Sequence, residues 1–293
     1  MFFSIVTPTY NRANLIGRVY ESLSKQTFKD FEWIVIDDGS TDNTKELISE
    51  YKKEADFDIK YIYTPNAGKA NALNKSIEYC TGFFYLVFDS DDWCDSDALL
   101  VFNEEWECLS ENEKLEYAAI SCLKKYKNDE LVGDDYSKIN KYGLSYIDRV
   151  NVNIKGDKWE CLLLRAVQEL KYPVFDSDKY MAPDYLWLKI AEQGYKTIFL
   201  NRALSIVEYQ ADGISKNNLY HRVANSKTTY RYYSDISKVE GLGFKYKLRM
   251  SINKNRFLFH SGFSFTVNDF FNPVFYLGFI MYANDKVKMG LRG

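Results

Sequence analysis

The sequence predicts an α/β fold: a doubly wound, mostly parallel sheet followed by a mainly helical C-terminal extension. Short apolar runs alternate with segments of helical periodicity over about the first 110 residues, which is the spacing of βαβ units. Several of these apolar runs end in polar or acidic residues, as strands do at the ligand-binding edge of an open α/β sheet. Beyond residue 213 the strand pattern stops and the periodicity becomes helical.

The first half of the chain supplies four expected strands and three intervening helices. The strands are expected at 2–7, 33–36, 59–63 and 83–88, and the helices at 12–26, 41–53 and 69–79. In the first helix, aliphatic side chains recur on one face. In the second helix, acidic residues occupy the first turn, where the helix dipole favours them. Asp95 or Ser96 is expected to cap a further helix after the fourth strand.

The second half of the chain is less regular. A strand is expected at 117–123, helices at 160–170 and 184–193, and two short strands at 196–200 and 204–209. Gly194 suits the position that ends the second of these helices. The segment 124–155 is polar and shows no clear period. We expect a domain over residues 1–213, with halves at about 1–110 and 111–213, and a helical region over 214–293.

The composition excludes several classes of protein. The chain has 293 residues and a hydrophobic content of 46%, enough for one large domain and a smaller addition. The five cysteines lack CxxC pairing and there are two histidines, so neither a zinc site nor a disulfide framework is expected. No stretch reaches the ~18 apolar residues of a membrane-spanning helix, and no signal peptide is recognisable. The expected location is the cytoplasm.

An apolar run that ends in a cluster of acids is the most informative stretch of the chain. Residues 83–88 have the pattern of a strand buried on both faces, and Asp89, Asp91 and Asp92 follow it directly. Packed carboxylates repel each other, and a divalent cation shared with the phosphates of a substrate would neutralise them. The alternative is a charged turn after a strand.

Other expected strand ends carry polar residues suited to a nucleotide. The segment 7–12 offers an aromatic ring and a basic group, 37–39 offers carboxylates, and Lys69 lies where a helix begins. Each of these segments alone is also ordinary turn chemistry. Because the sheet is expected to be parallel, these groups and the acids at 89–92 should face one crevice. Together they predict the binding of a nucleoside diphosphate with a metal ion.

Four motifs carry these side chains: TPTYNR at 7–12, DDGSTD at 37–42, NAGKANALN at 66–74 and DSDDW at 89–93. In their order and spacing they resemble the motifs of the family-2 glycosyltransferases of the GT-A fold. The resemblance covers about residues 1–210 and is not specific for the sugar. The later stretches GDKWE at 156–160 and PDYLW at 183–187 are similar to the bacterial branch that builds capsule, exopolysaccharide or O-antigen units.

The resemblance implies a role for each candidate residue. Tyr10 resembles the position that stacks on uracil, and Asp38 resembles the carboxylate that accepts a hydrogen bond from the uracil N–H. Asp89 resembles the acid that contacts the ribose. Asp91 resembles the ligand of a catalytic Mn²⁺ or Mg²⁺, which Asp92 could share. The candidates for nucleotide binding are Thr7, Pro8, Tyr10, Arg12, Asp38, Lys69, Asp89 and Ser90.

Asp184 is the candidate catalytic base. The family commonly has Glu-Asp before this late helix; here Pro183 takes the place of the Glu and the Asp is retained. The alternative for Asp184 is a helix cap, because Asp is favoured at helix starts and Pro in the turn before them. Three further side chains each have two interpretations. Asp157 and Trp159 would either contact the acceptor or serve as loop and packing residues. His221 would either bind the metal or be a solvated residue on a helix.

The expected function is that of an inverting, metal-dependent glycosyltransferase. It would move a hexosyl or N-acetylhexosaminyl group from a UDP-sugar to a hydroxyl of a saccharide acceptor, which the resemblance implies is lipid-linked. The alternatives are a nucleotidyltransferase and a non-catalytic protein that binds nucleotide sugars or partner enzymes. A nucleotidyltransferase usually has a glycine-rich loop after its first strand, and 7–12 contains no glycine. The presence of Asp91 and Asp184 argues against a non-catalytic protein.

The C-terminal region predicts a contact with membranes. Residues 257–283 contain two dense apolar and aromatic stretches with basic residues before and after them. Each stretch is too short to span a bilayer, but the basic flanks suit the surface of an anionic inner leaflet. We expect peripheral contact with the inner face of the plasma membrane; packing on the catalytic domain or a homodimer interface is the alternative. The basic residues do not interleave with the aromatic ones, so nucleic acid is not an expected partner.

Overall fold

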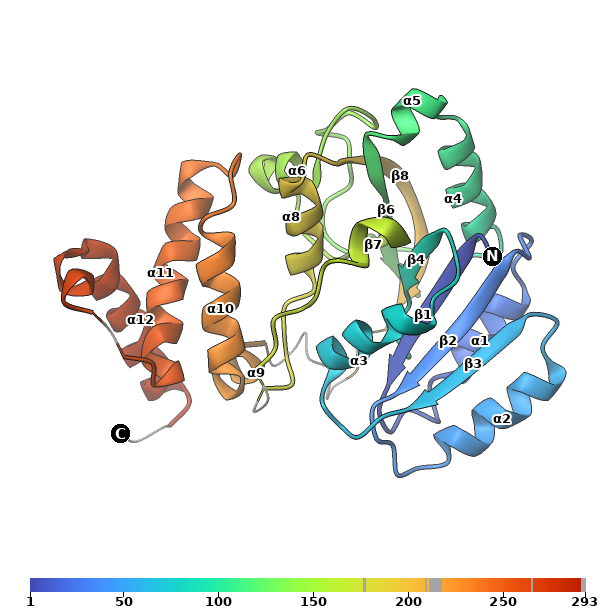
Figure 1. Cartoon of the computed structure of the whole chain (residues 1–293), viewed down its shortest axis with the longest axis horizontal. Coiled ribbons are helices and arrows are strands. Elements are labelled where there is room, and N and C mark those ends of the chain that lie inside the picture. The colour runs from blue at the N-terminus through green and yellow to red at the C-terminus, as the bar shows by residue number, and fades with distance from the viewer. Residues whose placement is uncertain (176–177, 209, 211–217, 265, 291–293) are drawn as a thin grey trace.

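A computed structural model describes residues 1–175, 178–208, 210, 218–264 and 266–290. Its centre is an eight-stranded sheet in the order β3-β2-β1-β4-β7-β6-β8-β5 (Figure 1). The strands are β1 Phe3–Thr9, β2 Phe31–Asp37, β3 Asp58–Tyr63, β4 Phe84–Val87, β5 Trp93–Cys94, β6 Tyr117–Tyr126, β7 Lys158–Leu163 and β8 Lys196–Val207. The helices of the first two thirds are α1 Gly17–Ser24, α2 Thr44–Glu54, α3 Lys69–Ser76, η1 Ile77–Tyr79, α4 Ala98–Glu107, α5 Glu111–Lys114, α6 Tyr146–Val152, α7 Leu164–Val167 and α8 Asp184–Glu192. They are followed by α9 Asn218–Ala224, α10 Ser226–Ile236, α11 Phe244–Ser261, η2 Val267–Phe271 and α12 Pro273–Lys288.

The first four strands form the predicted parallel half of the sheet. β1 pairs in parallel with β2 and β4, and β2 pairs in parallel with β3. β1 and β2 are buried along their whole length, as expected for parallel strands covered on both faces. Since the strands are parallel, the polar residues that follow β1, β2 and β4 meet at one edge of the sheet.

The other half of the sheet is mixed, and here one prediction is wrong. The helix expected over 160–170 begins late: residues 160–163 belong to β7, which pairs antiparallel with both β4 and β6, and the helical part is the short α7, Leu164–Val167. Every residue of β7 is buried, and the apolar run that starts at Cys161 continues into α7, so the sequence does not mark where the strand ends and the helix begins. β6 pairs in parallel with β8, and β5 pairs antiparallel with β8.

Several element boundaries also differ from the prediction. The expected helix at 12–26 begins only at Gly17, and the two short strands expected between 196 and 209 form the single strand β8. Irregularities in the pairing of β6 with β8 lie where the two short strands were expected to separate. The cap of α4 is Asp97, which makes no side-chain capping hydrogen bond, so the expected caps Asp95 and Ser96 are wrong. The segment without a clear period contains α6, which a Ser145 and Asp148 capping box begins.

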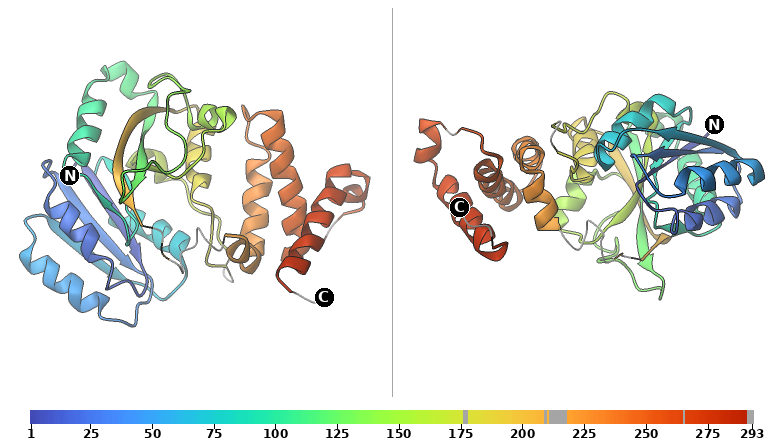
Figure 2. Two further views of the ribbon diagram at one scale, coloured as in Figure 1. Left: turned by 180° about the vertical axis from the view of Figure 1, so that it is seen from behind. Right: turned by 90° about the horizontal axis from the view of Figure 1, so that it is seen from below.

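The C-terminal helices pack side by side at one end of the molecule. α8 packs against α10, α10 against α11, and α11 against α12, so the helices extend outward from the sheet (Figures 1 and 2). Arg256 of α11 holds α12 through two hydrogen bonds to Asp285, with Nε–Oδ2 at 2.6 Å and Nη2–Oδ1 at 2.5 Å. The domain boundary predicted at 213–214 lies outside the described residues. Among the described helices, none is long and apolar enough to cross a membrane.

Candidate active site

A pocket of about 950 Å³ lies at the ends of the parallel strands, bordered by β6, β7 and the start of α8 and α9. It brings together nine of the residues predicted from the sequence: Pro8, Tyr10, Arg12, Asp38, Lys69, Asp89, Ser90, Asp91 and Asp92. Two predicted residues, Thr7 and Asp184, are not among the described residues that line it. These nine residues contribute one aromatic ring, two cations and four carboxylates to the pocket.

Thr7 and Tyr10, both in the motif TPTYNR, have different environments. The Thr7 side chain is fully buried, and its Oγ1 accepts a hydrogen bond from Trp33 Nε1 at 2.9 Å. The Thr7 side chain therefore belongs to the core. The Tyr10 side chain is 49% exposed and lines the pocket, so its ring is available to stack on a planar base.

Asp38 holds the loop that leads into α3. Its Oδ1 accepts from Ala67 N at 2.7 Å, and its Oδ2 accepts from Gly68 N at 2.8 Å. Gly68 has a φ of +92°, and a Cβ there would lie 2.1 Å from Lys179 O, so the loop requires glycine. Burial raises the pKa of Asp38 although both hydrogen bonds oppose the rise. Each carboxylate oxygen still has a second lone pair, which a uracil N–H could use.

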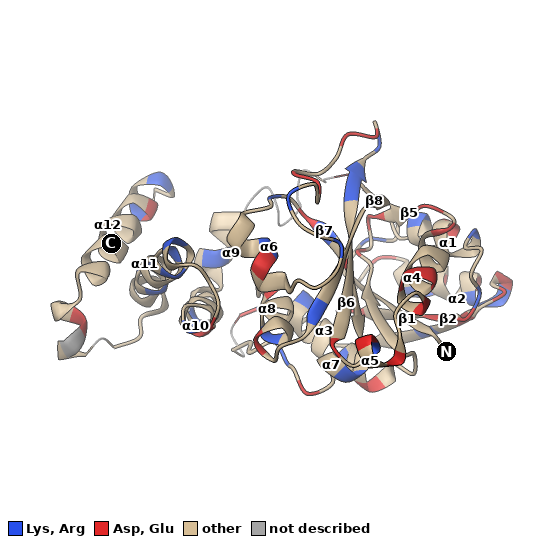
Figure 3. Cartoon of the chain, turned by 90° about the horizontal axis from the view of Figure 1, so that it is seen from above, with Lys and Arg blue, Asp and Glu red and all other residues tan. Residues whose placement is uncertain are grey.

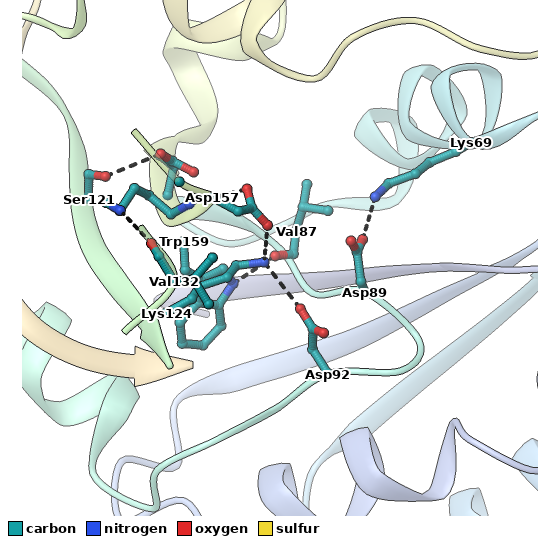
Figure 4. A network of polar contacts seen from close by, with 12 residues as sticks. Lys69, Val87, Asp89, Asp92, Ser121, Lys124, Val132, Asp157 and Trp159 are labelled. Carbon is teal, nitrogen blue, oxygen red and sulfur yellow. Dashed lines mark hydrogen bonds and ion pairs between the residues drawn. The ribbon is translucent and has the colours of Figure 1, made fainter. Parts of the chain in front are cut away.

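Lys69 and Asp89 form an ion pair on the floor of the pocket, with Nζ–Oδ1 at 2.5 Å (Figure 4). Burial disfavours the charge on Asp89, but the positive charges of Lys69 and Lys124 outweigh burial and lower the pKa of its carboxyl. Burial disfavours the charge on Lys69, but the charge and the hydrogen bond of Asp89 together outweigh burial and raise the pKa of Lys69. Both groups are therefore ionised at neutral pH.

Asp91 differs from its neighbours because its carboxylate has no hydrogen bond or ion pair with another described residue. It lines the pocket, and burial together with the charge of Asp89 raises its pKa. Within the described residues, no group of three or more His, Cys, Asp or Glu side chains gathers as a metal site. Asp91 thus offers a single oxygen donor group, which fits a cation that takes its other ligands from water and substrate phosphates.

Asp92 does not offer a free carboxylate to a metal ion, because Lys124 binds it. Lys124 Nζ lies 3.1 Å from Asp92 Oδ2 and 3.0 Å from Asp157 Oδ2, as Figure 4 shows. Burial raises the pKa of Asp92 to about 7, although the charge of Lys124 lowers it. The sequence analysis missed Lys124, because it occurs where the strand pattern fades into a polar segment and nothing nearby indicates its partner.

The wall opposite the nucleotide residues comes from β7 and the residue before it. Trp159 is buried and donates from Nε1 to Val87 O at 2.8 Å, which fixes the indole against the end of β4 (Figure 4). Glu160 is buried with Arg149, whose Nη1 lies 3.1 Å from its Oε1, and burial raises the pKa of Glu160 to about 7. Both Asp157 and Trp159 line the pocket, and so does His221.

Asp184 is the first residue of α8, directly after Pro183, which lines the pocket. No side-chain capping hydrogen bond occurs at this helix start. Instead, Asp184 Oδ2 accepts from Tyr232 OH of α10 at 2.8 Å. Burial raises the pKa of Asp184, while the Tyr232 hydrogen bond and the charge of Arg222 oppose the rise. The carboxylate is thus oriented by the C-terminal helices and not by capping.

The comparison with protein families decides among the classes of protein that this pocket fits. Residues 4–108 match the family model described as glycosyl transferase family 2. Over these residues the chain is similar to glycosyl transferase family 2. The match includes every candidate residue for the nucleotide and the metal, from Thr7 to Asp92, whereas Asp184 lies beyond it.

Two curated relatives match most of the chain. The putative teichuronic acid biosynthesis glycosyltransferase TuaG of Bacillus subtilis (strain 168) is 25% identical over 242 residues, which cover 80% of this chain and 88% of TuaG. The GalNAc(5)-diNAcBac-PP-undecaprenol beta-1,3-glucosyltransferase of Campylobacter jejuni is 25% identical over 258 residues, which cover 86% of this chain and 77% of that protein. Several other curated relatives are longer, and the chain spans only 17% to 31% of their length.

A solved structure confirms the predicted GT-A fold. The crystal structure of residues 1–349 of S. aureus TarS in complex with UDP-GlcNAc has a TM-score of 0.66 to this chain. The match covers 88% of this chain and 73% of the TarS chain, at 18% sequence identity.

Proposed function

We propose that the protein is an inverting glycosyltransferase that moves a sugar from a UDP-sugar to a hydroxyl of a lipid-linked saccharide in bacterial surface polysaccharide synthesis. One observation carries this proposal: a single pocket combines the exposed ring of Tyr10, the Lys69–Asp89 ion pair and the carboxylate of Asp91, which has no partner among the described residues. The ring of Tyr10 suits the base of a nucleoside diphosphate, and the Lys69–Asp89 pair suits its ribose and phosphates. The carboxylate of Asp91 suits the metal ion that accompanies the diphosphate.

On the donor side, Tyr10 stacks on uracil and Asp38 accepts its N–H. Asp89 contacts the ribose, and Lys69 and Arg12 balance the phosphate charge. Ser90 and the backbone at Thr7 and Pro8 complete the wall of the nucleotide site. The complex of TarS with UDP-GlcNAc supports a UDP-linked hexose or N-acetylhexosamine as the donor. The segment 1–110 forms the donor half of a catalytic domain and 111–213 the acceptor half.

The metal ion proposed for this reaction is Mn²⁺ or Mg²⁺, held by Asp91. The carboxylate of Asp91 fits such an ion because it faces the pocket without a partner on another described residue. When bound, a divalent cation supplies Lewis-acid stabilisation of the charge that grows on the leaving diphosphate. Asp92 supports this site indirectly, since its ion pair with Lys124 fixes the chain directly after Asp91.

Asp184 is the proposed general base on the acceptor side. It takes the proton of the acceptor hydroxyl as that oxygen attacks the anomeric carbon, while the bond from this carbon to the diphosphate oxygen breaks. A single displacement of this kind inverts the anomeric centre. The raised pKa of Asp184 improves its match to a base near neutral pH, and Tyr232 orients the carboxylate.

The proposed acceptor is a saccharide carried on a lipid diphosphate, as the name of the Campylobacter relative states for that enzyme. A peripheral site at the inner face of the plasma membrane would bring the protein to such an acceptor. Within 257–283, Phe257 and Leu258 are buried, and the Phe257 ring stacks on Tyr233 of α10. Leu277 and Ile280 on α12 are exposed and remain candidates for membrane contact or for a homodimer interface.

A panel of donors tests the proposed function. The protein is mixed with Mn²⁺ and, separately, UDP-glucose, UDP-GlcNAc, UDP-galactose and GDP-mannose, and both donor hydrolysis and thermal stabilisation are measured. UDP-sugars should stabilise the protein and be hydrolysed slowly without acceptor. Stabilisation by the GDP-sugar alone would contradict the donor assignment, and release of a nucleotidyl product in place of UDP would favour the nucleotidyltransferase alternative.

A further inference from the structure

A second cavity, of about 690 Å³, lies among the C-terminal helices beside the first. Side chains from α9, α10, α11 and α12 line it, namely Asn218, Leu219, Arg222, Tyr233, Lys245, Leu248, Arg249, Ile252, Asn253, Arg256 and Met281. Six of these lie on α11 at intervals of one, three or four residues, so they form one face of that helix. Lys247 and Lys254 of the same helix lie off this face.

The cavity is strongly basic. Its described lining has four Lys or Arg residues and no Asp or Glu. Asp285 neutralises Arg256, but neither Lys245 nor Arg249 forms an ion pair with a described residue. Figure 3 shows these basic segments on α9 and α11. Unpaired cations around one cavity attract a multivalent anion, and phosphate oxygens accept the charge-assisted hydrogen bonds that Lys and Arg donate.

Arg222 is held at the edge of this cavity in an unusual environment. Its Nε donates to Asn218 Oδ1 at 2.6 Å, and its guanidinium lies over the rings of Tyr232 and Tyr233, at 5.5 and 5.4 Å. Its Nη1 is buried and has no hydrogen-bond partner among the described residues. A buried donor without an acceptor is costly, and an anionic oxygen bound in the cavity is the type of partner it lacks.

The same cavity is also apolar. Leu219, Leu248, Ile252 and Met281 line it together with the cations. A free inorganic ion gains nothing from these four side chains. A phosphate that carries an apolar chain would use both kinds of lining, and so would release apolar surface from water.

The cavity connects to the candidate active site through α9. Asn218 lines both cavities, and His221 of the same helix faces the active-site pocket while Arg222 faces the second cavity. Arg222 also lies over Tyr232, the residue whose hydroxyl binds Asp184. A molecule bound in the second cavity beside Arg222 would therefore be linked to the proposed catalytic base, Asp184, through Tyr232.

We propose that the cavity bounded by α9, α10, α11 and α12 binds the phosphate or diphosphate group of an amphiphile. That this amphiphile is the lipid-linked acceptor rests on the proposed function; the binding of a phosphate with an apolar chain does not. Its diphosphate contacts Lys245, Arg249 and Arg222, its first apolar carbons contact α11 and α12, and its saccharide extends past α9 into the active-site pocket.

Binding of farnesyl diphosphate to the full chain tests this proposal, with inorganic pyrophosphate and farnesol as the other two ligands. Saturating UDP is present throughout, and titration calorimetry gives the affinities. The Lys245→Gln/Arg249→Gln protein should bind farnesyl diphosphate about ten-fold more weakly than wild type, because two charge-assisted contacts are lost. The matched Lys247→Gln/Lys254→Gln protein has the same charge change on another face of α11 and should bind as wild type does.

Equal affinity of the wild-type and Lys245→Gln/Arg249→Gln proteins for farnesyl diphosphate would overturn the proposal. If pyrophosphate binds as tightly as farnesyl diphosphate, with the same dependence on the two residues, the site takes free phosphates and the amphiphile assignment is wrong. If the double variant has a lowered melting temperature, the single variant Arg249→Gln takes its place, because Arg249 is exposed. Its affinity for farnesyl diphosphate is then compared with that of wild type in the same way. UDP affinity is measured on each protein and is expected to be unchanged by the substitutions. If no protein binds UDP, the proposed function is contradicted, but the amphiphile site is not.

Discussion

Lys124 and Asp92 form an ion pair inside the protein, with Nζ–Oδ2 at 3.1 Å and less than a tenth of either side chain exposed. Asp92 follows β4 on the donor side, Lys124 lies on β6, and Asp157, which shares the same ammonium group, precedes β7 on the acceptor side. One buried cation thus joins the chain beside the proposed metal ligand to the wall that faces the acceptor.

Lys124→Met should lower the free energy of unfolding by about 3–5 kcal/mol, because it leaves Asp92 buried without its counter-charge. Urea unfolding followed by circular dichroism measures this change. Adding Asp92→Asn should recover part of the loss. Lys125→Met is the matched control: its partners Asp95 and Asp129 are more exposed, and the loss should stay within about 1 kcal/mol. Equal losses for the two Lys variants would show that the buried pair has no special role.

The donor side of the site could be predicted from the sequence because each of its groups follows a strand in the chain. Parallel strands bring such groups to one edge whatever the loops between them do, so the positions of Tyr10, Lys69 and Asp91 depend on local patterns that can be recognised. Thr7 was expected to contact the nucleotide through its backbone, and its side chain lies in the core, where Oγ1 accepts a hydrogen bond from Trp33 Nε1.

The acceptor side could not be predicted in the same way. β7 is buried on both faces, so its sequence resembles a buried helix, and its antiparallel partners β4 and β6 come from other parts of the chain. The partner of Asp184 is Tyr232, 48 residues later on a different helix. Such pairs depend on how helices pack, which single-sequence periodicity does not specify.

Asp91→Asn should abolish glycosyl transfer and remove the metal-dependent part of UDP binding. The substitution removes the charge of the proposed metal ligand, while the fold should persist because the carboxylate makes no hydrogen bond or ion pair with another described residue. Transfer assays and calorimetry with Mn²⁺ or with EDTA measure both effects. Asp97→Asn, at a carboxylate outside the pocket, should keep activity. Transfer that persists in EDTA would refute the metal proposal.

Tyr10→Ala should weaken UDP binding by about 1–3 kcal/mol, the usual contribution of a ring that stacks on a base. Tyr63→Ala is the matched control, because Tyr63 is also exposed but does not line the pocket. Wild-type protein should prefer UDP over GDP and ADP. If Tyr10→Ala binds UDP as wild type does, the ring does not contact the base.

Asp184→Asn should reduce transfer by about 10² or more while UDP affinity stays unchanged. The base must be ionised, so transfer should rise with pH through the pKa of Asp184, which burial places above the ordinary 3.8. The Tyr232 hydrogen bond lowers this pKa, so Tyr232→Phe should move the acidic limb of the pH–rate profile to higher pH. Tyr233→Phe is the control. An unmoved limb, with a fall only in thermal stability, would make Asp184 a structural residue.

The exposed apolar face of α12 predicts that the full chain floats with anionic vesicles at low salt. Leu277→Glu/Ile280→Glu should abolish flotation, because it replaces two exposed apolar side chains with charges that the vesicle surface repels. Leu115→Glu is the control, since Leu115 is even more exposed than Leu277 and Ile280 but lies in the α/β part of the chain. Truncation before Asn255 is not a suitable test, because it removes the buried ring of Phe257 from its stack on Tyr233.

Sedimentation of the same proteins separates membrane contact from dimer formation. If α12 meets lipid, wild type and Leu277→Glu/Ile280→Glu are both monomers in solution and differ only in flotation. If α12 meets a second copy of the chain, wild type is a dimer that the double substitution dissociates, and vesicles make no difference. Raising the salt concentration adds a second criterion: it should release the protein from vesicles, because screening weakens the attraction of Lys286 and Lys288 to anionic lipid, but it should leave an apolar dimer intact.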